Sequence, residues 1–136
     1  MLRIAIQAKG RLNEQSIDLL SEAGIRVAES KRKLISRAEG FPLEVLYLRD
    51  DDIPQAVSMG VADLGIVGEN EFVERAEEAE IVHRLGFSKC RLSLAIHKET
   101  EYDGLQWFNH KKIATSYPHI LKNFPNEQQI EADIHV

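Results

Sequence analysis

Four short segments of this sequence combine residue types that bind anions or metal ions. They are 9–11, 49–52, 65–70 and 115–118. In the first segment Gly10 lies between Lys9 and Arg11, directly before a helical pattern. This arrangement predicts a phosphate or carboxylate site, because the glycine lets backbone approach a ligand and the helix start offers free N–H groups. A turn with two solvated basic side chains explains the same residues equally well.

The second segment places three carboxylates, Asp50, Asp51 and Asp52, directly after Arg49. Such carboxylates can hold Mg²⁺ through one or two oxygens, together with water and substrate phosphate. They can also favour the N-terminus of the next helix electrostatically. The helix explanation is favoured for Asp51 and Asp52. It does not account for Arg49, whose planar guanidinium suits an anion or an acidic neighbour.

The other two segments allow two interpretations each. Glycines at a predicted strand end give backbone access to a ligand, with Glu69 and Asn70 at the mouth of the turn, but a plain helix cap fits equally well. Ser116 and Tyr117 follow a predicted strand, where they could form a hydroxyl-rich anion pocket or a capped turn. Neither pattern decides between its two interpretations.

Strands and helices alternate along the chain, with Asn13 as the expected N-cap of the first helix and Gly24 as its stop. This alternation predicts βαβ units and a mostly parallel sheet. Ligands bind beyond the carboxyl ends of such strands, which is where all four segments lie. A polar stretch at 98–104 predicts a crossing between two lobes. We expect strands at 3–7, 25–27, about 34–35, 43–48, 62–68, 92–96, 112–115 and 132–136, and helices at 13–23, 54–59, 69–80 and about 119–124.

Composition excludes several classes of protein. The chain has 136 residues and a formal net charge of −5, which argues against a surface that binds nucleic acid through bulk positive charge. No apolar run is long enough to span a bilayer, and we expect a cytoplasmic protein. The lone Cys90 excludes an internal disulfide, and a catalytic thiol is not favoured there. The histidines show no metal-ligand spacing, so no protein-bound metal is expected.

Five strings of this sequence, in this order, resemble the catalytic chain of ATP phosphoribosyltransferase. They are "QAKGRL", "KRKLISRAEGFPLEVLYLRDDDIP", "GVADLGIVGEN", "LGFSKCRLSLA" and "KKIATSYPHILK". The resemblance runs from Met1 to Val136. It implies an enzyme that joins ATP and 5-phosphoribosyl 1-pyrophosphate into N1-(5-phosphoribosyl)-ATP and pyrophosphate, the first step of histidine biosynthesis, with Mg²⁺ carried on substrate phosphates.

The resemblance also implies an α/β fold of two lobes, like type II periplasmic binding proteins, with the active site in a cleft. The first lobe, 1–97, would be nearly complete, and the second, 98–136, would be partial. The catalytic residues stay unknown. The residues expected to bind substrate are Lys9, Gly10, Arg11, Arg49, Asp50, Glu69, Asn70, Ser116 and Tyr117.

The family's phosphoribosyl-pyrophosphate loop would follow Val136, so we expect an N-terminal fragment that does not catalyse the reaction by itself. The apolar edges of strands 112–115 and 132–136 favour association with another chain, and we expect a homo-oligomer. The alternative is a non-catalytic cytoplasmic lobe of the periplasmic-binding-protein type that binds an anion or another solute.

Overall fold

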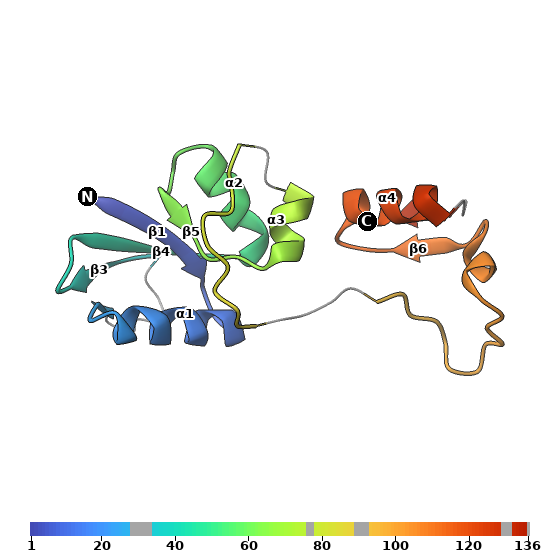
Figure 1. The fold of residues 1–136 in the computed structure, drawn as a ribbon, viewed down its shortest axis with the longest axis horizontal. Coiled ribbons are helices and arrows are strands. Elements are labelled where there is room, and N and C mark those ends of the chain that lie inside the picture. Colours follow the sequence, from blue (N-terminus) through green and yellow to red (C-terminus); the bar gives the residue numbers. More distant parts are fainter. Residues whose placement is uncertain (28–33, 76–77, 89–92, 129–131, 136) are drawn as a thin grey trace. The chain divides into compact units, whose positions relative to one another are not determined.

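The computed structural model describes residues 1–27, 34–75, 78–88, 93–128 and 132–135. Contacts divide the chain into two compact units, Met1–Cys90 and Arg91–Val136, and each is described by itself (Figure 1). This division falls before the polar stretch at 98–104 that the sequence suggested as a crossing. The assignment of lobes to 1–97 and 98–136 stays a prediction.

The first unit is built on a five-stranded sheet with the order β2-β3-β4-β1-β5. The strands β4, β1 and β5 are parallel, whereas β3 pairs antiparallel with β2 and β4. The expectation of a mostly parallel sheet is therefore corrected to a mixed sheet. The short connection through Gly40 explains the difference, because a tight turn joins antiparallel strands and a parallel pair needs a longer crossover. The strands are β1 Leu2–Gln7, β2 Arg26–Val27, β3 Ile35–Glu39, β4 Leu43–Leu48 and β5 Leu64–Gly65.

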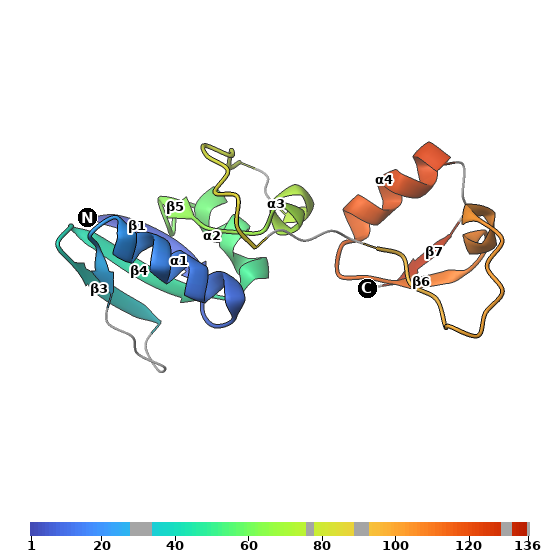
Figure 2. The same ribbon diagram turned by 60° about the horizontal axis from the view of Figure 1, so that its bottom comes forward.

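Two helices cover opposite faces of this sheet (Figures 1 and 2). Helix α1, Arg11–Glu22, packs on the face that carries Ile6 and Val45, and Leu20 belongs to the same buried cluster. Helix α2, Ile53–Ser58, packs on the other face, which carries Ala5 and Leu46. Successive residues of a strand point to opposite faces, so the near-continuous apolar runs of β1 and β4 supply both cores.

The ends of α1 differ in how well the sequence predicts them. Gly10, with φ +107°, is the N-cap, so the expectation that Asn13 caps the helix is wrong. At the other end Gly24 has φ +83°, and the amide of Ile25 donates to the carbonyl of Leu20 at 2.8 Å. A glycine in the left-handed region ends the helix there, as expected.

Three predicted elements are shorter in the structure or absent. Strand β5 has two residues rather than the run 62–68, because it pairs with β1 only through Leu64–Gly65. Helix α3 is Glu69–Arg75, and residues 76–77 of the expected continuation lie outside the described residues. The spacing of four residues between Glu71 and Arg75 predicts an ion pair along this helix, and the pair is present at 3.2 Å. The described residues of 92–96 form no strand, since their apolar alternation reflects partial burial and not pairing.

The second unit contains a small parallel β-α-β arrangement. Strands β6, Lys112–Ala114, and β7, Asp133–His135, pair in parallel and are joined by helix α4, Pro118–Gln128. These elements confirm the predicted strands and helix. A 3-10 helix, η2, Leu105–Phe108, contributes the buried Phe108, against which the ring of Trp107 packs edge-on at a centroid distance of 5.2 Å. Across the described parts of both units, no helix is long and apolar enough to cross a membrane.

The backbone of Gly65 passes close to α2, and this contact generates a prediction about stability. A Cβ at Gly65 would lie 2.7 Å from the Cγ2 atom of Ile53 and 3.0 Å from that of Val57. Gly65→Ala should therefore lower the free energy of unfolding by about 1–3 kcal/mol, the usual effect of overpacking. Urea unfolding followed by circular dichroism measures this change.

Gly68→Ala is the matched control, because a Cβ there would meet nothing within 4 Å. Its effect should stay within about 0.5 kcal/mol. Equal stability of the two variants would contradict the close packing of β5 on α2.

Candidate functional site

The parallel strands β4, β1 and β5 end at one edge of the first sheet, which we call the carboxyl edge. Strand β1 lies between the other two, and the amide of Ala8 donates to the carbonyl of Leu48 at 2.7 Å. The loops after all three strands therefore start side by side. The carboxyl edge carries all of the site residues expected in this unit, which are Lys9, Gly10, Arg11, Arg49, Asp50, Glu69 and Asn70.

The loop after β1 presents two cations and the start of α1. The side chains of Lys9 and Arg11 are exposed, and Gly10 holds a left-handed conformation between them. The amides of Arg11 and Leu12 lie in the first turn of α1, so they have no acceptor within the helix. Positive side chains and helix-start amides together favour a bound anion.

Gln7 and Asn13 hold the two ends of this loop together. The side-chain amide of Asn13 donates to the carbonyl oxygen of Gln7 at 2.7 Å, and the backbone amide of Asn13 donates to the Oε1 atom of Gln7 at 3.2 Å. The sequence interpretation missed both contacts. Two amide side chains that flank a Lys-Gly-Arg turn were the available signal, but an N-cap role for Asn13 fitted the same pattern.

The loop after β4 is a 3-10 helix, η1, of Asp50–Asp52. The Nε atom of Arg49 lies 3.5 Å from Oδ1 of Asp51, and the side chain of Arg49 is 80% exposed. Oδ1 of Asp50 accepts the amide of Asp51 at 3.0 Å. Asp52 precedes α2 without a side-chain hydrogen bond to it, which leaves a purely electrostatic effect on that helix.

The loop after β5 combines a packing glycine with an ion pair that the sequence interpretation missed. Gly65 is explained by its contact with α2, so backbone access to a ligand is not needed to account for it. Glu69, at the start of α3, pairs through Oε1 with Nη1 of Arg84 at 3.3 Å. Asn70 follows in the same turn. No local pattern predicts the pairing of Glu69 with Arg84, because it depends on how the chain returns after α3.

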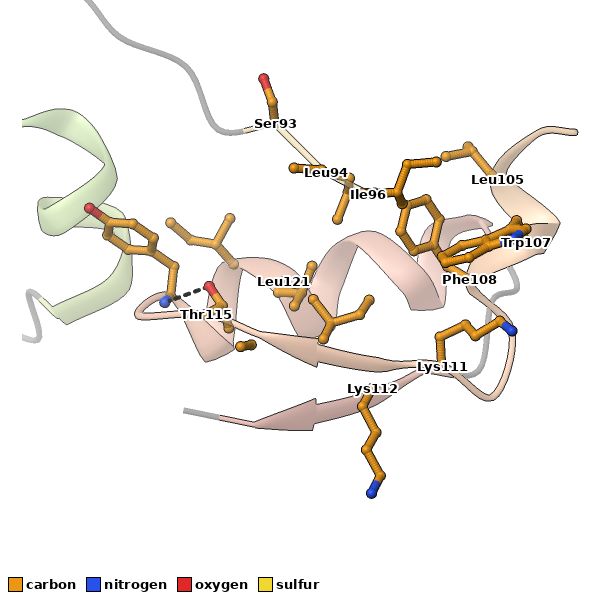
Figure 3. A pocket seen from close by; sticks show the side chains of 15 residues that line it. Ser93, Leu94, Ile96, Leu105, Trp107, Phe108, Lys111, Lys112, Thr115 and Leu121 are labelled. Carbon is orange, nitrogen blue, oxygen red and sulfur yellow. Dashed lines mark hydrogen bonds between the residues drawn. The ribbon is translucent and has the colours of Figure 1, made fainter. Parts of the chain in front are cut away.

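The remaining predicted residues, Ser116 and Tyr117, lie in the second unit beside a cavity of about 880 Å³. Figure 3 shows apolar side chains such as Leu94, Ile96 and Phe108 around this cavity. The amide of Tyr117 donates to Oγ1 of Thr115 at 2.9 Å, which is the local bond of a hydroxyl-capped turn.

Tyr117 lines this cavity, whereas Ser116 is exposed and does not. Lys112 extends away from the other labelled side chains (Figure 3). The capped-turn interpretation therefore suits Thr115, and an anion-binding role of Ser116 and Tyr117 stays a prediction.

The part of the chain that the structure describes contains no cluster of side chains that could hold a metal ion. No group of three or more histidine, cysteine or acidic side chains comes together within those ranges. Cys90 lies outside the described residues, so its environment is not assigned. The carboxyl edge of the first sheet, with its exposed cations, is therefore the candidate anion-binding site of this α/β unit.

Comparison with known proteins identifies the family. A family model described as "HisG: ATP phosphoribosyltransferase" matches residues 49–136. The curated ATP phosphoribosyltransferases of Bacteroides thetaiotaomicron and Phocaeicola vulgatus are 64% and 65% identical to this chain over 136 residues. The alignments cover 100% of this chain and 48% of each relative. The chain belongs to the ATP phosphoribosyltransferase family, and it spans about half the length of the curated relatives it matches.

A solved structure shares the fold. The chain is similar to a protein described as "ATP phosphoribosyl transferase (HisG:HisZ) complex from Thermotoga maritima", with a TM-score of 0.67 and 20% sequence identity. The match covers 99% of this chain and 63% of the other. At this identity the likeness supports the mixed α/β fold and nothing finer.

The pair of Gln7 and Asn13 generates a prediction about stability. Asn13→Ala removes the bond from the Asn13 side chain to the carbonyl of Gln7 and should lower the free energy of unfolding by about 1 kcal/mol. Thermal unfolding followed by circular dichroism measures the change. Asp18→Ala, at an exposed position of α1, is the control and should not destabilise the protein, since alanine favours helix. A loss at position 18 as large as that at 13 would contradict a specific role for the Asn13 side chain.

Proposed function

We propose that this chain is part of an enzyme that joins ATP and 5-phosphoribosyl 1-pyrophosphate to give N1-(5-phosphoribosyl)-ATP and pyrophosphate, the first step of histidine biosynthesis. Membership of the ATP phosphoribosyltransferase family supports the reaction. The observation that carries the site is the position of Lys9, Arg11 and Arg49, exposed cations at the carboxyl ends of two paired strands. Both proposed substrates are rich in phosphate, which such cations bind.

The proposed reaction needs positioning and charge stabilisation more than a nucleophile from the protein. As pyrophosphate leaves, negative charge grows on its oxygens while the anomeric carbon becomes cation-like. Fixed cations and helix-start amides stabilise that growing charge without reorganising during the reaction. In this proposal Lys9 and Arg49 bind phosphate oxygens, Arg11 adds positive charge, and the Gln7–Asn13 pair keeps their loop in place.

We propose that Mg²⁺ comes to this site with the substrate phosphates and not in a site of its own. Asp50 and Asp51 are the carboxylates nearest to Arg49 in the chain, and both have contacts within η1. Mg²⁺ commonly binds one or two carboxylates plus water and substrate phosphates, so these two residues are suitable partners. Bound Mg²⁺ would neutralise phosphate charge.

Further properties of the whole protein belong to the same proposal. We infer a fold of two lobes like that of type II periplasmic binding proteins, with Ser116 and Tyr117 contributing from the second lobe. Association into a homo-oligomer is also proposed, because β6 and β7 pair as a small two-stranded sheet within the described residues and the edges of such strands favour pairing with another chain. A cytoplasmic location follows from ATP as a substrate, and neither nucleic acid nor membrane is a proposed partner.

The proposed site predicts how single cations contribute to binding. Lys9→Gln and Arg49→Gln should each weaken binding of ATP to this chain about tenfold, because each removes one charged hydrogen-bond donor worth ~1.5 kcal/mol or more. Isothermal titration calorimetry at constant ionic strength measures the affinities.

Arg26→Gln is the matched control, since Arg26 is exposed on the edge strand β2, paired with Glu39 and not at the carboxyl edge. It makes the same change in net charge and should leave the affinity unchanged. Equal losses of ATP affinity at positions 9, 26 and 49 would indicate nonspecific electrostatic attraction and would contradict the proposed site.

A further inference from the structure

The segment 81–88 runs past the carboxyl edge of the first sheet, from the side of α2 and α3 to α1 (Figure 1). In the middle of the segment, Arg84 pairs with Glu69 at the beginning of α3. At its end the hydroxyl of Ser88 hydrogen-bonds to Oε1 of Gln15 in α1, and Phe87 packs against the core beneath that helix. The contacts of Phe87 and Ser88 therefore anchor the end of this segment on the first unit.

Arg84 brings another cation to this edge, and its contact with Glu69 is easily exchanged. Nη1 of Arg84 lies 3.3 Å from Oε1 of Glu69, and both side chains are 65% exposed. Exposed ion pairs contribute little stability, because water screens the charges and the long side chains lose freedom. A phosphate group offers a guanidinium two or more oxygens in a matching geometry, which is the stronger partner.

Arg84 also differs from Arg75, the arginine at the other end of the neighbouring helix. Arg75 is 27% exposed and pairs with Glu71, whose side chain is 10% exposed. That pair is part of the packing of α3, and its arginine has little freedom to reach a ligand. Between these two arginines, the contacts favour Arg84 as the one available to an anion.

We propose that Arg84 is a further anion-binding residue of the carboxyl-edge site, and that it exchanges Glu69 for a diphosphate or triphosphate group. This inference rests on the proposed function. Glu69 is then a positioning residue, which holds the guanidinium at the edge when no ligand is bound. The exchange leaves Glu69 unpaired toward solvent, at small cost because its side chain is already exposed.

The test uses the 136-residue chain and inorganic pyrophosphate as the probe. Arg84→Gln should weaken pyrophosphate binding about tenfold in calorimetry, with an unchanged melting temperature because the lost ion pair is exposed. Arg84→Lys, which keeps the charge and loses the planar fork, should recover part of the affinity. Arg26→Gln, which makes the same charge change away from this edge, should not alter the affinity.

A variant of Glu69 tests the exchange itself. Glu69→Gln should strengthen pyrophosphate binding several-fold, because Arg84 no longer leaves a carboxylate to bind the anion. In the Arg84→Gln background the same substitution should have a smaller effect. Equal gains in the two backgrounds would overturn the exchange, and a loss of affinity would instead assign Glu69 a direct contact with the ligand.

A nuclear magnetic resonance titration distinguishes direct anion binding by Arg84 from a purely structural role of this residue. The Nε–Hε signal of Arg84 should shift with pyrophosphate and saturate together with the backbone amide of Gly10. If Lys9→Gln and Arg49→Gln weaken binding but Arg84→Gln does not, the inference about Arg84 is wrong and the proposed function stands. If the wild-type chain binds no pyrophosphate, or none of the three substitutions weakens binding, both proposals are overturned.

Discussion

The parallel pairing of β1 with β4 on one side and β5 on the other is the constraint on which the rest of the first unit depends. Register places Gln7 opposite Leu48 and Ala5 opposite both Leu46 and Gly65. Three loops distant in sequence consequently leave the sheet at one edge. The same pairing buries Ile6 and Val45 on one face and Ala5 on the other, which anchors a helix on each side.

This arrangement separates stability from ligand binding. The core at the centre of the sheet is apolar, and the ionic groups that could bind phosphate lie on exposed loops at its edge. Their positions are nevertheless defined, by the Gln7–Asn13 hydrogen bonds on one loop and by the local contacts of η1 on another. Exposed cations held in this way can bind a phosphate without a large cost of burying charge.

Features set by neighbouring residues were predictable from the sequence. The apolar runs of β1 and β4, the stop at Gly24 and the ion pair of Glu71 with Arg75 follow from local pattern, and each was predicted. The resemblance to a known family likewise rested on short continuous stretches of sequence. The candidate residues at strand ends were located by the rule that α/β sheets bind ligands beyond the carboxyl ends of their strands, and that rule depends on topology alone.

Features that depend on distant contacts were not predictable in this way. The pairing of β3 with β4 is set by a turn inside a polar stretch, where alternation is weak. Asparagine is a common N-cap residue, yet the side chain of Asn13 bonds to Gln7, on the preceding strand. Arg84 reaches Glu69 only because the chain turns back toward the start of α3. No local sequence pattern predicts that change of direction.

The central claim is that phosphate binds at the carboxyl edge of the first sheet. Mapping of backbone amide chemical shifts during titration of the labelled chain with ATP tests it most directly. We expect the largest shifts on Gly10, the N-cap of α1, and on Arg11 and Leu12 in its first turn. Shifts concentrated at the opposite edge, around Arg3 and Glu44, would contradict it, as would the absence of any saturable shift in the first unit.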